Sequence, residues 1–255
     1  MKNSIKCCLF AAIALTAASC LSSGNGSVSY TLVGEFNYIA ENPTIYKLQD
    51  SLIFANKVQM GDGCSMLCTK CDGINENFCG GWKISTKKGS PEDTEELSMF
   101  TSAGKNAGLT ITEESYTSSN KAYAVFCQTY DMPSYDITFE FSGYSKSTCY
   151  VIGFYINNTK YVENLADAGQ IPAGDYLKVI ATFYKNGAPV GTEEKFLVDN
   201  TGTELKVVKD WEEWKMEDVM KTDVDAVKFS VESGTGVLGE GFCLDNFVAS
   251  IALEY

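Results

Sequence analysis

Four cysteines close together in the sequence form the pattern that most directly suggests chemistry. Cys64, Cys68 and Cys71 form a C-x3-C-x2-C run, and Cys79 follows eight residues later. This spacing is similar to that of iron–sulfur ligand loops, and four thiolates can also close a tetrahedral zinc site. In an exported protein the same cysteines are expected to form disulfides, because the cell envelope is oxidising. We favour one or two disulfides over zinc or reduced thiols, and the sequence leaves three pairings open.

Residue types that are missing from the chain exclude several kinds of chemistry. Among 255 residues, 33 are acidic and 20 are basic, every basic residue is a lysine, and histidine is absent, so the net charge is -13. Without histidine there is no Ser-His-Asp or Cys-His catalysis. Without arginine there is no bidentate group for a phosphate or carboxylate. The acidic charge disfavours nucleic acid as a partner. The sequence therefore favours a protein that is not an enzyme.

Flat aromatic side chains are the groups best suited to hold a neutral ligand, such as a glycan or a corrinoid. Trp211 and Trp214 lie three positions apart, so on a strand they would point to opposite faces and one of them would be core. The residues Asn157 to Thr159 are predicted to form a turn between two strands, where asparagine commonly bonds the backbone. The candidate ligand-binding residues are Trp82, Trp211, Trp214, Tyr130, Tyr135, Tyr155, Asn157 and Tyr161.

Asp245 and Asn246 lie inside an apolar segment near the C-terminus. A buried carboxylate needs a partner, so Asp245 is expected to bond backbone groups or to join a calcium site. These two residues are the metal candidates that the sequence offers, and no other cofactor is expected.

The segments that must position these residues show the period-two alternation of β-strands. Turn sequences rich in glycine and asparagine separate them. About ten such strands predict an all-β fold, a two-sheet jelly-roll-like β-sandwich. Two segments, Val162–Ala168 and Glu212–Met220, also fit a short helix, but for the second we favour a strand that enters a turn. The predicted strands are Tyr30–Ile39, Ser51–Gln59, Gly108–Thr112, Ala122–Thr129, Tyr135–Phe141, Thr148–Ile156, Tyr176–Tyr184, Lys195–Val198, Ala226–Glu232 and Gly241–Ile251.

The N-terminal segment has the features of a secretory signal peptide, predicted over residues 1–19. Lys2 and Lys6 precede an apolar run, and small residues lead directly to Cys20. This ending resembles a bacterial lipobox, so we expect Cys20 to be lipidated and residues 20–29 to form a flexible tether. Residues 30–255 are then a single β-sandwich domain, attached to the membrane only through its lipid anchor. The expected location is the outer membrane, at the cell surface or on the periplasmic face.

Several motifs occur in the order found in a known family. They are Gly80-Gly81-Trp82, Asn120–Phe126 (NKAYAVF), Gly153–Tyr161 (GFYINNTKY) and Gly241–Phe247 (GFCLDNF). With these motifs the chain, from about Leu52 to Ile251, resembles a jelly-roll domain of Bacteroidota lipoproteins that was long of unknown function. Some relatives in such families are understood to capture corrinoids (vitamin B12) at the cell surface, and others sit among genes for glycan uptake.

This resemblance implies a non-catalytic binding lipoprotein for nutrient capture, with a small-molecule or glycan ligand and an outer-membrane transporter as a candidate partner. Two alternatives remain from the residues themselves. One is a glycoside hydrolase that uses a pair of carboxylates, for which the acidic chain offers many residues. The other is a structural or adhesive envelope protein, which would complete an exposed sheet edge with another chain.

Overall fold

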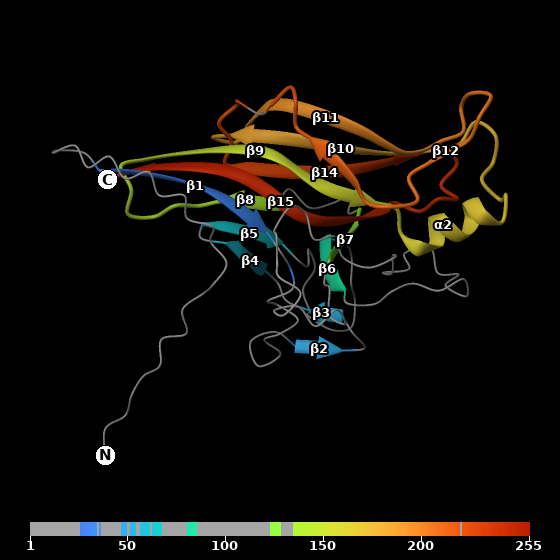
Figure 1. The fold of residues 1–255 in the computed structure, drawn as a ribbon, viewed down its shortest axis with the longest axis horizontal. Coiled ribbons are helices and arrows are strands. Elements are labelled where there is room, and N and C mark those ends of the chain that lie inside the picture. Colours follow the sequence, from blue (N-terminus) through green and yellow to red (C-terminus); the bar gives the residue numbers. More distant parts are fainter. Residues whose placement is uncertain are drawn as a thin grey trace, which may run out of the picture.

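The computed structural model describes residues 26–34, 36, 47–49, 52–54, 57–61, 63–67, 81–85, 123–128, 135–219 and 221–255. In this part of the chain the elements are antiparallel strands and a short helix, α2 (Lys160–Asp167). The strands form two sheets that pack face to face, and the longest strands run along the length of the molecule (Figure 1). The prediction of an all-β, jelly-roll-like sandwich is therefore confirmed.

The eight-stranded sheet, which we call sheet A, has the order β13-β9-β15-β7-β6-β3-β2, and β1 also pairs with β15. The seven-stranded sheet, sheet B, has the order β12-β11-β10-β14-β8-β5-β4. The strands of sheet A are β1 (Ser27–Gly34), β2 (Lys47–Gln49), β3 (Leu52–Phe54), β6 (Gly81–Ser85), β7 (Tyr123–Cys127), β9 (Lys146–Asn157), β13 (Glu212–Lys215) and β15 (Gly241–Glu254). Those of sheet B are β4 (Lys57–Gly61), β5 (Cys64–Leu67), β8 (Ile137–Phe139), β10 (Tyr176–Lys185), β11 (Ala188–Asp199), β12 (Lys206–Val207) and β14 (Ala226–Ser233).

Two of the predicted strands have other bounds in the structure. The segment Ser51–Gln59, predicted as one strand, is divided into β3 in sheet A and β4 in sheet B. The segment Lys195–Val198 is only the end of β11, which begins at Ala188. Proline and small residues at the start of β11 hide its length, because they have low strand propensity.

Strand β15 organises sheet A. One side of β15 pairs with β9, and the other side pairs first with β7 and then with β1. The register with β9 shifts between Asp245 and Val248, and Asn246 has a φ of 50° in the left-handed region. Asparagine tolerates this conformation better than most residues do. The irregularity thus lies where β15 changes its partner from β7 to β1.

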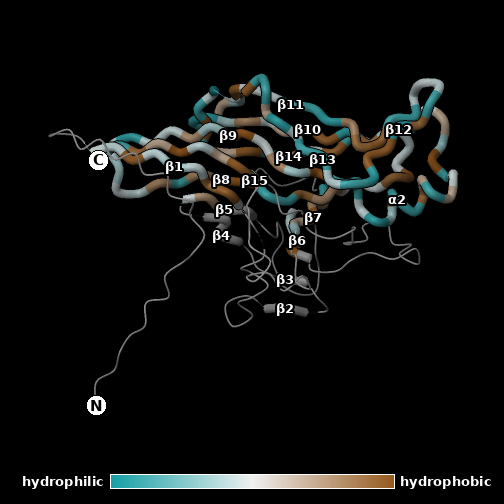
Figure 2. The backbone as a smooth tube through the Cα atoms, in the orientation of Figure 1, coloured by the Kyte–Doolittle hydropathy of each residue, from teal (hydrophilic) through white to brown (hydrophobic). Residues whose placement is uncertain are grey.

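The main hydrophobic core lies between the sheets. Strand residues alternate between this core and the outside, and Figure 2 shows hydrophobic and hydrophilic stretches alternating along the long strands. Near its centre Trp82 is fully buried, and its ring lies 5.0 Å from that of Phe126 and 5.5 Å from that of Phe229, measured between centroids. Phe229 comes from sheet B and Trp82 and Phe126 from sheet A, so this aromatic group joins the two layers.

The two ends of the sandwich are formed by different elements. The start of β1 and the C-terminus lie at one end, where Ser27 pairs with Glu254, and α2 lies at the other (Figure 1). Because β1 begins at Ser27, residues 27–29 belong to sheet A rather than to the tether that the sequence predicted. Asn157 ends β9, and Asn158 and Thr159 lead into α2, so the prediction of a turn between two strands was wrong. Within the described residues, no helix is both long and apolar enough to cross a membrane.

Candidate binding face on sheet B

Strand β10 exposes every second side chain on the outside of sheet B. Leu177, Val179, Ala181 and Phe183 are buried in the core, and the residues between them are partly exposed. The register between β10 and β14 is continuous from Leu177 to Tyr184, so these outward residues share one face. We call this surface the outer face of sheet B. Its residues are Tyr176, Lys178, Ile180, Thr182 and Tyr184 of β10, Thr192, Glu194 and Phe196 of β11, Lys228, Ser230 and Glu232 of β14, and Tyr135 before β8.

Phe196 is the most exposed large apolar side chain on this face, at 47%. Its neighbours on β11, Leu197 and Val198, are buried, whereas Phe196 places an apolar ring on the solvent side of the strand. The Tyr176 ring packs edge-on against it with 5.9 Å between centroids, and the Lys178 Nζ lies 5.9 Å from its centroid. An exposed ring held by neighbours on both sides is suited to stack against a flat apolar ligand surface.

Lys178 is fixed by two carboxylates on neighbouring strands. Its Nζ lies 2.8 Å from Glu232 Oε2 on β14 and 3.3 Å from Glu194 Oε2 on β11. The hydrogen bond with Glu232 is the main cause that raises the pKa of Lys178 above its usual value. Lys178 is therefore charged at neutral pH, and it lies beside the Phe196 ring with two carboxylates that more than offset its charge.

A second aromatic pair lies at the other end of β10. The rings of Tyr184 and Tyr135 are 4.9 Å apart between centroids and are inclined at 49°. Both side chains are partly exposed. Among the sequence candidates that lie in the described part of the chain, Tyr135 is the residue on this face.

The three tryptophans occupy the interior instead. Trp82 and Trp214 belong to the main core, where Trp214 packs against Phe154 at 5.2 Å between centroids. Trp211 lies on the opposite side of sheet A and packs against Tyr123 at 5.9 Å. Trp211 and Trp214 therefore face opposite ways, as their spacing predicts. With exposures of 0%, 8% and 5%, Trp82, Trp211 and Trp214 do not offer open faces to a ligand.

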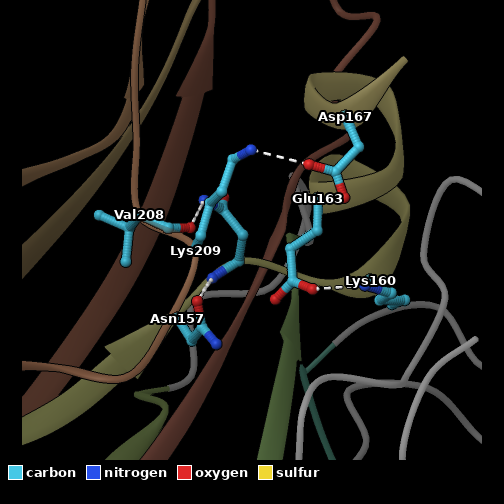
Figure 3. Close-up of polar contacts among 7 residues, drawn as sticks. Asn157, Lys160, Glu163, Asp167, Val208 and Lys209 are labelled. Carbon is cyan, nitrogen blue, oxygen red and sulfur yellow. Dashed lines mark hydrogen bonds and ion pairs between the residues drawn. The ribbon is translucent and has the colours of Figure 1, made fainter.

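Asn157 and its neighbours form a polar junction between the two sheets, shown in Figure 3. Asn157 Oδ1 accepts a hydrogen bond from the Asn158 amide at 2.8 Å. The Asn158 Nδ2 donates to the carbonyl oxygens of Leu197, at 3.1 Å, and Val208, at 2.7 Å. Because Leu197 lies on β11 of sheet B, this side chain fastens the end of β9 to the other layer. The role of these buried amides is structural.

The helix α2 beside this junction carries its own ion pairs. The Lys160 Nζ and Glu163 Oε2 are 2.9 Å apart, and Lys209 reaches Asp167 at 2.7 Å (Figure 3). The hydrogen bond with Lys209 is the main cause that lowers the pKa of Asp167. Tyr161 donates to the carbonyl of Val237 at 3.0 Å and packs against the core. Tyr155, on β9, packs against the cluster of Tyr123 and Trp211 on the outside of sheet A.

The described cysteine and carboxylate candidates, Cys64, Asp245 and Asn246, are buried and are not part of the outer face of sheet B. Cys64 is buried at the start of β5, and the candidates Cys68, Cys71, Cys79, Cys20 and Tyr130 lie outside the described residues. The disulfide prediction therefore stays a prediction. Asp245 is buried and accepts the Asn246 amide at 2.8 Å, as expected of a carboxylate that bonds the backbone. In the described part of the chain, no cluster of three or more Cys, Asp or Glu side chains is arranged to hold a metal ion.

Most residues of the outer face of sheet B were missed at the level of sequence, although a signal was present. The segment Tyr176–Lys185 (YLKVIATFYK) alternates between aliphatic or aromatic core residues and a second series that includes tyrosine, lysine and threonine. The second series identifies the solvent side of the strand. Tyr176 and Tyr184 belong to that series, whereas Trp82, Trp211 and Trp214 do not lie on this face.

The fold and this face together define a class: an all-β sandwich with an exposed aromatic surface on one sheet. No family model and no curated protein matches the chain. Among solved structures, a DUF4465 family protein from Bacteroides caccae is similar over 86% of this chain and 98% of that one, with a TM-score of 0.54 and 17% identity. The likeness shows that the two share a fold, and it agrees with the resemblance to a Bacteroidota domain of unknown function.

Proposed function

We propose that this protein is a non-catalytic, ligand-binding lipoprotein of the cell envelope that captures a nutrient, either a corrinoid or a glycan. The observation that carries the proposal is the exposed Phe196 ring, with Tyr176 and Lys178 beside it. Exposure of such an apolar ring to water is unfavourable, and a bound ligand that covered the ring would remove this cost. Glycans and corrinoids both present apolar surface that an aromatic ring can contact, together with polar groups for hydrogen bonds.

The buried carboxylates support binding rather than hydrolysis, because each bonds groups of the protein itself. Asp136 Oδ2 accepts the Phe229 amide at 2.7 Å. Asp175 accepts the Thr235 amide at 2.8 Å and its hydroxyl at 2.7 Å. A glycosidase instead needs two carboxyl groups that face each other across the sugar. These side chains act as turn and strand supports.

The position of the first strand is compatible with a short lipid tether. The Tyr255 amide donates to the Gly26 carbonyl at 2.9 Å, so the sandwich begins six residues after Cys20. A chain of that length spans at most about 22 Å. The domain would thus be held close to the membrane, and replacing Cys20 by alanine should release the protein into the soluble fraction.

The test is isothermal titration of a soluble form that starts near Ser22, with cyanocobalamin and with a panel of polysaccharides. We expect the parent to bind one of these ligands, and Phe196→Ala to weaken binding at least tenfold. Leu205→Ala is the matched control, because Leu205 is 41% exposed but lies outside the outer face of sheet B. Glycosidase turnover without such binding would support the hydrolase instead, and equal losses in both variants would exclude this face.

A further inference from the structure

The outer face of sheet B has an aromatic pair at each end of β10. Tyr176 and Phe196 form one pair, and Tyr184 and Tyr135 form the other. Tyr176 and Tyr184 are eight residues apart on one continuous strand. At about 3.3 Å per residue, Tyr184 is about 26 Å from Tyr176 along the strand and about 20 Å from Phe196, which lies opposite Lys178.

The surface between the pairs is mostly polar. Its side chains on β10 are Lys178, Ile180 and Thr182. On β14, Ser230 lies opposite Ile180. Across the three strands β11, β10 and β14, the side chains with charge on this face are Lys178, Lys228, Glu194 and Glu232. The two signs are balanced, so the face offers no surplus charge to attract an ionic ligand.

From this arrangement we propose that the outer face of sheet B binds a neutral, extended polysaccharide, which lies along β10 and contacts both aromatic pairs. This inference rests on the proposed binding function and selects between its two ligand classes. Neutral sugars have flat C–H faces that stack on aromatic rings, and their hydroxyl groups can bond threonine, serine and charged side chains. A compact ligand would touch only one pair at a time. The acidic chain as a whole, with a net charge of -13, also disfavours an acidic polysaccharide.

Two linked contacts make the affinity depend on chain length. When one pair has bound a sugar, the second pair meets the same chain at a high effective concentration. A chain shorter than about 20 Å cannot use this gain, since that is the shortest span between the pairs, from Phe196 to Tyr184. Each pair should therefore contribute to the binding of long chains, whereas only one should matter for short ones.

The experiment titrates the full chain, kept soluble in a polyoxyethylene detergent that carries no sugar. The probes are disaccharides and octasaccharides of linear neutral glycans, namely glucans, mannans and xylans, together with cyanocobalamin. The parent should bind one octasaccharide at least tenfold more tightly than its disaccharide. Phe196→Leu and Tyr184→Leu should each remove most of this ratio, because leucine keeps the apolar volume and removes the flat ring. Leu205→Ala should retain it, and circular dichroism would verify that each variant is folded.

The outcomes separate this inference from the function on which it rests. Equal affinity for short and long chains, or binding of cyanocobalamin alone, would overturn the extended ligand and leave the binding function in place. A loss in Phe196→Leu without any loss in Tyr184→Leu would do the same, because one pair would then suffice. If the folded parent bound none of these probes, the proposed function itself would be contradicted.

Discussion

The two sheets use aromatic residues on their outer faces in opposite ways. On sheet A, every residue of β7 from Tyr123 to Cys127 is buried, including those that point away from the main core. Tyr123, Val125, Trp211 and Cys243 form a second hydrophobic cluster on that side, with Tyr155 packed against it. On sheet B, by contrast, the outward residues of β10 are all partly exposed and Phe196 of β11 is 47% exposed.

This difference separates aromatic residues that stabilise the fold from those that are available for a ligand. A strand that is buried on both faces reads as a continuous apolar run, as Tyr123–Cys127 (YAVFC) does. A strand with one solvent-exposed face alternates between apolar and polar residues. An aromatic residue on the exposed face contributes little burial free energy to the fold. The comparison therefore predicts large stability effects on sheet A and large binding effects on sheet B.

The largest expected effect is from Tyr123→Ala on sheet A. The ring is fully buried against Trp211, so its removal leaves a cavity and should lower the free energy of unfolding by about 3–5 kcal/mol. The matched change on sheet B, Tyr176→Ala, should lower it by only about 1 kcal/mol, because that ring is partly exposed. Urea unfolding followed by tryptophan fluorescence measures both. Similar losses in the two variants would remove the contrast between the faces.

The next prediction concerns the thiol of Cys243 in the same cluster on sheet A. Burial is the main cause that raises its pKa well above the usual value, and Glu163 and Cys127 raise it further. An unfolded cysteine ionises near pH 8.5, so above that pH the unfolded state gains stability while the folded thiol stays protonated. The contribution of this group to stability is thus complete below about pH 8.5 and is lost as the pH rises towards the folded pKa.

For a single such group, the free energy of unfolding falls by about 0.7 kcal/mol per pH unit at pH 8.5 and by about 1.4 kcal/mol per pH unit well above it. Between pH 8.5 and 10, the parent should therefore lose about 1.6 kcal/mol more than Cys243→Ala. Both proteins are measured at each pH. The effects of lysine, tyrosine and the other cysteines on stability then cancel in the difference between the two free energies of unfolding. Parallel pH profiles for the two would mean that this thiol is not desolvated in the folded state.

On sheet B, Phe196→Ala should have a small effect on stability and a large one on binding. The ring is half in water, so its loss should change the free energy of unfolding by about 1 kcal/mol or less. Binding of the ligand found by titration should weaken at least tenfold. The decisive measurement determines both the free energy of unfolding and the affinity for the ligand on the same preparation of the variant. A loss of stability close to that of Tyr123→Ala would place Phe196 among the structural residues and would contradict its role in recognition.

The fold was more predictable from the sequence than the face. Period-two alternation located β9, β10, β14 and β15 within a few residues, because their core side is strictly apolar. The turn assigned to residues 157–159 was wrong, since Asn158 finds its partners, Leu197 and Val208, far along the chain. No local pattern encodes such a contact. Trp82 and Trp214 were proposed as ligand contacts because their rings are flat, but a large apolar ring also favours the core, and only packing decides between the two roles.

The smallest expected effect comes from Lys178→Met on the outer face of sheet B. The partners of Lys178, Glu194 and Glu232, have side chains that are 51% and 48% exposed, so water already stabilises their charges. Ion pairs of this kind contribute about 0–1 kcal/mol to stability, and salt screens them. The free energy of unfolding should thus fall by less than about 1 kcal/mol, and the deficit should shrink in high salt.

The same change would alter the face for a ligand, because it leaves two carboxylates beside the Phe196 ring without their lysine. Binding of a neutral glycan should weaken less in Lys178→Met than in Phe196→Ala, since the ring remains. Glu232→Gln is the control, because it removes one ion pair and keeps the lysine. If Lys178→Met instead destabilised the protein by several kcal/mol, the polar groups of sheet B would be structural, and the contrast with sheet A would rest on Phe196 alone.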